Sequence, residues 1–120
     1  MIREYGLRFR DTSGTGRIVS LTSDHTVGNL PYGASKGALG RITLAAAQEL
    51  CHLGVTANMI NPGPIDTGCL SQQTQENCIS QTPLGRLGTP QGTAHLVDFR
   101  CSPQGQWING QLLKSNGGFT

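Results

Sequence analysis

Short apolar runs that alternate with helical segments are the feature that most restricts how this chain can fold. RIVSLTS at residues 17–23 and VTANMI at residues 55–60 are β-prone runs bounded by turn residues. Between them, residues 31–53 place apolar side chains three or four positions apart, which predicts a helix. Strands that alternate with helices favour a parallel sheet, so the fold class is expected to be α/β.

The remaining segments extend this alternation. Residues 3–16 are typical of a helix end followed by a Ser/Gly/Thr turn. Thr89 and Pro90 suit the N-cap and first turn of a second helix that ends near Cys101. A third short strand is expected at residues 111–115, and the polar residues 69–82 are expected to form a mobile flap. We therefore predict a parallel sheet of about three strands, because each strand run is separated from the next by helix.

The predicted helix at 31–53 carries one apolar stripe, formed by Leu39, Ile42, Ala46, Leu50 and Leu53. Ala38, Leu44 and Ala45 lie off this stripe, so the helix is expected to be buried on more than one side. In the second helix, Arg100 lies beside the apolar face. Its guanidinium must therefore extend to water or find a polar partner inside.

Composition excludes several classes of function. The chain has 120 residues, 36% hydrophobic and 13% charged, which suits one globular domain. A net charge of +2, with no run of basic residues, argues against binding to nucleic acid or an anionic membrane. No stretch approaches the roughly 20 apolar residues of a membrane helix, and residues 1–15 lack the apolar core of a signal peptide. A cytoplasmic protein is the expectation.

The cysteines do not form a metal-binding pattern. None of Cys51, Cys69, Cys78 and Cys101 belongs to a C-x-x-C pair, and no zinc-type histidine spacing accompanies them. We expect free thiols in a reducing compartment and no metal site.

The stretch YGASK contains the most informative pair of polar residues. Tyr32 and Lys36 are four positions apart at the start of the predicted helix, so their side chains lie on one face. A cation one helical turn from a phenol favours the phenolate, which suits the tyrosine to general acid–base chemistry. The alternative interpretation is an ordinary tyrosine and lysine on a helix surface.

Five ordered motifs resemble the C-terminal half of the classical short-chain dehydrogenase/reductase family. They are GRIVSLTS, YGASK, NPGPIDT, PLGRLGTPQGTA and WINGQLLKSNGG, and together they cover nearly the whole chain. The resemblance implies that the predicted sheet is a partial, doubly wound parallel sheet, the C-terminal half of a Rossmann-like fold. It also implies an NAD- or NADP-dependent oxidoreductase that reduces a small-molecule carbonyl or oxidises a secondary alcohol.

The resemblance also assigns roles to residues. Ser23 would hold the substrate oxygen, Tyr32 would donate or accept the proton, and Lys36 would bind the ribose hydroxyls and favour the phenolate. Tyr32 and Lys36 thus belong to both the catalytic and the cofactor-binding set. The other residues implied to line the nicotinamide and its neighbouring phosphate are Pro62, Gly63, Ile65 and Thr67.

The sequence departs from the family pattern in two respects. No Gly-rich turn leads from the first strand into a helix, and SGTG at residues 13–16 precedes a strand, so the nucleotide-binding element is not found. We therefore expect residues 1–120 to be a single truncated domain that lacks the N-terminal dinucleotide-binding half. Ser23 and Tyr32 are nine positions apart, closer than is usual in the family. Thr22 and Ser20 are the fallback candidates for the serine.

Two competing patterns are weaker. GASKG at residues 33–37 fits the Gly-x-Ser-x-Gly pattern of hydrolases, which requires a strand directly before the serine, and here helix surrounds Ser35. His25, His52 and His95 are far apart in sequence, and only His25 lies beside the candidate serine.

The alternative function is that of an inactive remnant that acts as an oligomerisation or interaction module. In the family that the chain resembles, the helix matching residues 31–53 pairs with its mate across a two-fold axis. A homo-oligomer through this helix is therefore expected, because isologous helix pairing needs only one self-complementary face.

Overall fold

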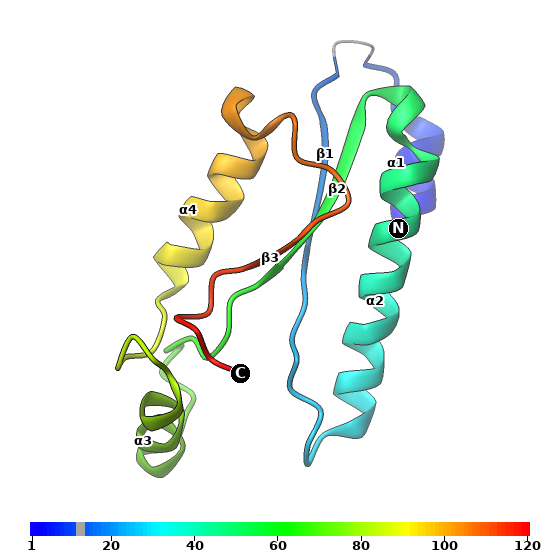
Figure 1. Ribbon diagram of the computed structural model, residues 1–120. Helices are drawn as coiled ribbons and strands as arrows, with labels where there is room; N and C mark the ends of the chain where they lie inside the picture. Colours follow the sequence, from blue (N-terminus) through cyan, green and yellow to red (C-terminus); the bar gives the residue numbers. More distant parts are fainter. Residues whose placement is uncertain (12–13) are drawn as a thin grey trace.

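A three-stranded parallel sheet is the centre of the computed structural model, which describes residues 1–11 and 14–120 (Figure 1). The strands are β1 (Gly16–Leu21), β2 (Val55–Asn61) and β3 (Leu112–Lys114), in the order β1-β2-β3. β2 pairs with β1 over six residues and with β3 over three, all in parallel. The predicted α/β class with three parallel strands is confirmed. The turn predicted at 13–16 begins outside the described residues.

Helices cover both faces of this sheet. α1 (Ile2–Arg8) and α2 (Leu30–Glu49) lie on one side of the strands, and α4 (Pro90–Cys101) lies on the other (Figure 1). α3 (Gln72–Gln81) follows β2, and two short 3-10 turns occupy η1 (Cys51–Leu53) and η2 (Pro103–Gly105). The parallel pairing requires a crossover between successive strands, because each connection must return to the same end of the sheet.

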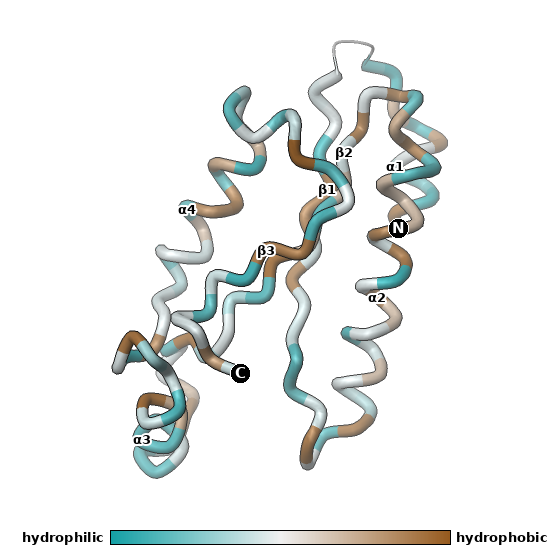
Figure 2. The backbone as a smooth tube through the Cα atoms, in the orientation of Figure 1, coloured by the Kyte–Doolittle hydropathy of each residue, from teal (hydrophilic) through white to brown (hydrophobic). Residues whose placement is uncertain are grey.

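Two predicted segments differ from the structure. The helix predicted to Leu53 ends at Glu49, and η1 then tightens the chain into Gly54, whose φ of +71° suits a residue without a side chain. The flap predicted at 69–82 is mostly α3, and Figure 2 shows this segment as largely hydrophilic. The Ser71 hydroxyl caps α3 by accepting from Thr74 N at 3.3 Å.

The buried face of α2 is made of small residues. Gly33, Thr43, Ala46 and Ala47 are buried, whereas Ile42 of the predicted stripe is 53% exposed. Thr43 is completely buried, and its hydroxyl bonds Ser20 Oγ and Leu39 O, both at 2.8 Å. Small side chains let α2 approach the strands closely, so Ala46 of the expected stripe is buried and Ile42 is not. The expectation of burial on a second side is wrong for Ala38 and Ala45, which are both exposed.

Two asparagines fix the loop that leads into β3. Asn58 is buried in β2, donates to Ile108 O at 2.9 Å and accepts from Gln111 N at 3.0 Å. Asn109, on the loop itself, accepts from Ala57 N and donates to Ala47 O, both at 2.9 Å. These side-chain bonds add to two backbone bonds before β3, Gly110 N to Ala57 O at 3.0 Å and Met59 N to Gln111 O at 2.8 Å.

Arg100, which the sequence predicted to need either water or a polar partner, has backbone partners inside the protein. The side chain is completely buried, and it donates to the carbonyl oxygens of Gly105 and of Ile108, the latter at 2.6 Å. Burial lowers the pKa of this guanidinium, and the positive charge of Arg17 lowers it further. The guanidinium therefore ties α4 to the segment from Gly105 to Ile108, at the cost of holding a cation away from water.

We expect Arg100→Ala to lower the free energy of unfolding by about 2–4 kcal/mol, because the carbonyls of Gly105 and Ile108 each lose one of their donors and a cavity remains. Arg41→Ala, which removes an exposed arginine of α2, should change the free energy by at most about 0.5 kcal/mol. Urea denaturation of both variants measures the difference, and equal stability of the two would contradict this role.

Candidate active site at the carboxyl ends of the strands

The loops that follow the three strands meet at one edge of the sheet, as parallel topology requires. A cleft of about 420 Å³ lies at this edge, largely apolar apart from one polar end. Three of the predicted site residues line it, namely Ser23, Gly63 and Ile65.

Ser23 lies just beyond the end of the β1–β2 ladder. Thr22 N still donates to Ile60 O at 2.9 Å, and the Ser23 hydroxyl then accepts from His25 N at 3.1 Å. The two fallback candidates face α2 instead. Ser20 is buried against Thr43, and the Thr22 hydroxyl is 3.5 Å from Lys36 O.

Tyr32 and Lys36 lie together on the first turns of α2. Asn29 caps the helix by accepting from Tyr32 N at 3.4 Å, with Pro31 in the first turn. Lys36 Nζ lies 5.4 Å from the centre of the Tyr32 ring and donates to Leu21 O at 3.0 Å. The ammonium is therefore held between the phenol and the carboxyl end of β1.

The structure forms two groups of candidate residues. Tyr32 and Lys36 form one, whereas Ser23, Gly63 and Ile65 share the cleft, and no hydrogen bond joins Ser23 to Tyr32 within residues 14–120. The loop between the groups packs tightly on α2 at Gly33, where an added Cβ would lie 2.6 Å from Thr26 Cγ2. Glycine at this position lets the loop approach the helix.

The loop after β2 is fixed at both ends. Gly63 N donates to Asn61 Oδ1 at 3.1 Å, and Gly63 has a φ of +67°. Farther along, Gly88 N donates to Pro64 O at 2.9 Å, and Gly88 O accepts from Asp66 N at 3.0 Å. Of the other predicted residues on this loop, Pro62 and Ile65 are half-buried and Thr67 is exposed.

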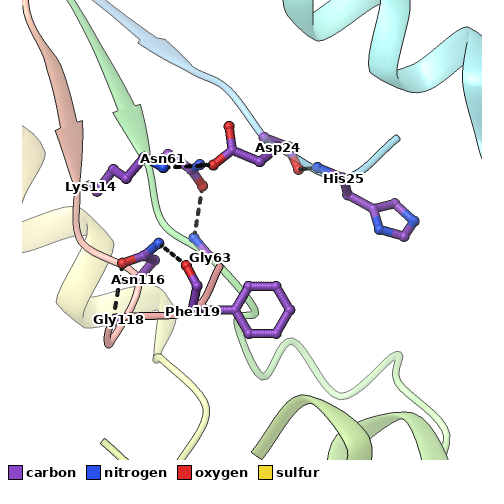
Figure 3. Close-up of polar contacts among 9 residues, drawn as sticks. Asp24, His25, Asn61, Gly63, Lys114, Asn116, Gly118 and Phe119 are labelled. Atoms are coloured by element: carbon purple, nitrogen blue, oxygen red, sulfur yellow. Dashed lines mark hydrogen bonds and ion pairs between the residues drawn. The ribbon is translucent and has the colours of Figure 1, made fainter. Parts of the chain in front are cut away.

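A polar network that the sequence analysis missed crosses all three strand ends (Figure 3). Asp24 Oδ2 accepts from Asn61 Nδ2 at 2.7 Å and from Lys114 Nζ at 3.1 Å. Each residue lies at or just after the end of a different strand. Their positions at the strand ends could have predicted this network, because the carboxyl ends of parallel strands meet at one edge of the sheet.

The competing patterns receive no support from the structure. Ser35 lies inside α2 and donates to Tyr32 O at 2.7 Å, with no strand-to-helix turn at it. All four cysteines are unpaired. Within the described ranges, no three His, Cys, Asp or Glu side chains are grouped as metal ligands, and no helix is long and apolar enough to cross a membrane.

The chain is similar in sequence to known proteins over most of its length. Residues 4–120 match the family model described as enoyl-(acyl carrier protein) reductase. An uncharacterised oxidoreductase, YjdA of Bacillus subtilis, is 38% identical over 97% of this chain and 48% of its own length. An NADPH-dependent aldehyde reductase-like protein from Arabidopsis thaliana is 37% identical over 88% of this chain and 42% of its own.

A solved structure agrees with these sequence matches. A blue fluorescent protein from a metagenomic library, in complex with NADPH, has a TM-score of 0.79 and 32% identity. The match covers 89% of this chain and 46% of that protein. The chain thus spans about half the length of the relatives that it matches.

Gly63 provides a test of the loop geometry. A Cβ at Gly63 would lie 2.5 Å from Asn116 Cβ, whereas a Cβ at Gly68, which also has positive φ, would meet nothing within 4 Å. We expect Gly63→Ala to lower the free energy of unfolding by about 2–4 kcal/mol, from backbone strain plus the clash. Gly68→Ala, with strain alone, should cost about 1–2 kcal/mol. Equal losses in thermal denaturation would show that the contact with Asn116 is unimportant.

Proposed function

Because the chain belongs to the short-chain dehydrogenase/reductase family, we propose that it carries the catalytic side of an NAD(P)-dependent oxidoreductase. The reaction is reduction of a small carbonyl compound or oxidation of a secondary alcohol. The observation that supports this most is the position of Lys36, whose ammonium lies beside the Tyr32 ring and on the last carbonyl of β1. An ordinary surface lysine has no such double contact.

The residues present suit the ribose and nicotinamide part of the cofactor. Lys36 Nζ uses one donor on Leu21 O, which leaves two for ribose hydroxyls. Tyr32 is 39% exposed, so its hydroxyl is accessible, and Pro62, Gly63, Ile65 and Thr67 lie on one braced loop after β2. The pyrophosphate would be held by a further segment or a partner chain, because no Gly-rich turn leads from a strand into a helix here.

The proposed reaction divides the work among three side chains. The bound nicotinamide supplies or accepts the hydride. Ser23 donates a hydrogen bond to the substrate oxygen, and Tyr32 transfers the proton to or from that oxygen. Lys36 stabilises the phenolate form of Tyr32 by its positive charge. Substrate would enter through the cleft that Ser23 lines.

The residues of this chain do not distinguish NADPH from NADH, so both nucleotides are titrated. We expect calorimetry of the purified chain to show saturable binding of one of them in the micromolar range. Lys36→Ala should raise the Kd about tenfold, since it removes charged hydrogen bonds to the ribose. Arg41→Ala, which removes an exposed cation from the same helix, should leave the Kd unchanged.

No binding by a folded chain would exclude an oxidoreductase made of this chain alone. If binding occurs, carbonyl substrates can be screened by the loss of NADPH absorbance. Tyr32→Phe should then lower the turnover by at least about 100-fold, as expected for the loss of a general acid.

The second candidate function, an oligomerisation module, is favoured by an apolar groove between α1 and α2. The groove has a volume of about 600 Å³, and its apolar lining includes Ile2, Leu7, Ile42, Ala45, Leu50 and Leu53. Leu7 and Ile42 are each more than half exposed in the single chain. We infer that a second copy covers this groove through α2, since a two-fold axis would bring identical apolar faces together.

We expect a dimer by light scattering, and Ile42→Glu should raise its dissociation constant about 100-fold by placing a charge in each half of the contact. Gln48→Glu adds the same charge to an exposed position of α2 outside the groove and should not change the mass. A monomeric chain at all concentrations would exclude the module.

A further inference from the structure

A single carboxylate oxygen connects the ends of all three strands. β1 and β3 lie on opposite sides of β2, so their ends are about 10 Å apart and share no backbone bonds. Asp24 Oδ2 nevertheless accepts from Asn61 Nδ2 at the end of β2 and from Lys114 Nζ at the end of β3. Figure 3 shows the carboxylate turned toward both groups.

Asn61 connects Asp24 to the loop after β2. Its side chain is buried, and both polar atoms are used, because Nδ2 donates to Asp24 and Oδ1 accepts from Gly63 N. Loss of the Asp24 acceptor would leave a buried amide donor unpaired, which is costly. A continuous chain of hydrogen bonds therefore runs from Lys114 through Asp24 and Asn61 to Gly63.

The same contact holds the loop of the candidate serine. Among residues 23–29, all of which the structure describes, only Asp24 hydrogen-bonds β2 or β3 through its side chain. Ser23 directly precedes Asp24, and its hydroxyl is bonded only within its own loop, by His25 N. Asp24 is therefore the side chain that connects the Ser23 loop to the neighbouring strands.

We propose that Asp24 is a positioning residue that holds the Ser23 loop and the Gly63 loop in fixed register across the strand ends. Its role in catalysis rests on the oxidoreductase function proposed above, but the contacts themselves do not. Asp24 lines the cleft without belonging to the proton-transfer group, and it acts through Asn61 on Gly63.

The two bonds of Asp24 are expected to contribute unequally. The pair with Lys114 is solvent-accessible, with side chains 61% and 51% exposed, and such ion pairs contribute little. The bond to Asn61 involves a buried amide and carries the effect. Asp24→Asn keeps an acceptor for Asn61 and loses the charge, whereas Asp24→Ala loses both, so the two variants separate the bonds.

The test is amide hydrogen exchange of the purified chain, followed by NMR. Asp24→Ala should accelerate exchange of the Gly63 amide about tenfold, with β2 amides unchanged as the check on folding. Asp24→Asn should restore most of the protection, and Lys114→Met should leave it within about twofold of wild type. Glu4→Ala, which breaks the exposed pair with Arg8, controls for loss of one negative charge.

A second readout concerns the nucleotide. If the wild-type chain binds NADPH, Asp24→Ala should raise the Kd about fivefold or more, with rescue by Asp24→Asn, because Gly63 lies on the cofactor loop. Unchanged Gly63 exchange in Asp24→Ala overturns the proposal, as does a normal Kd with altered exchange. If wild type binds no nucleotide, the proposed function fails, and the exchange data alone decide the role of Asp24.

Should Asp24→Ala fail to fold, Asp24→Lys takes its place, since it removes the acceptor and repels Lys114 while keeping a long side chain. It should give the same faster exchange at Gly63, and normal exchange there would reject the proposed role.

Discussion

The structure depends on how β2 pairs the polar groups that it buries. β2 is the central strand, and it carries two asparagines, Asn58 and Asn61, among its buried residues. A buried amide without partners would destabilise the strand, and each of these side chains is hydrogen-bonded to a neighbouring loop. Asn58 holds the segment that becomes β3, and Asn61 holds the loops at the carboxyl end. One constraint thus builds both the sheet and the edge where the candidate site lies.

Local sequence signals were sufficient for much of the fold. Thr89 and Pro90 marked the start of α4, and the apolar runs marked β1 and β2, because caps and strand patterns act over a few residues. The buried face of α2 was not predictable in this way. Thr43 and Ala47 face the sheet in place of Ile42, since close approach of the helix favours small side chains, and periodicity alone does not reveal that distance.

In the candidate site too, contacts set by local spacing were predictable and contacts set by strand order were not. Tyr32 and Lys36 are neighbours because helical spacing makes them so, and the sequence predicted this pair. The contact of Lys36 with Leu21 and the network of Asp24, Asn61 and Lys114 depend on strand order and register, which join residues up to 90 positions apart. The buried environment of Arg100 is a similar case, because its partners are carbonyls of the following turn and not side chains.

The bond between Lys36 and Leu21 also determines how thermal motion reaches the pair. The lysine belongs to the helix by its backbone and to the sheet by its ammonium, while no hydrogen bond of the Tyr32 side chain is found in the described residues. When the first turn of α2 fluctuates, the ring moves with the helix and the ammonium remains near the strand. The sheet thus sets the position of the charge, and the helix sets the position of the ring.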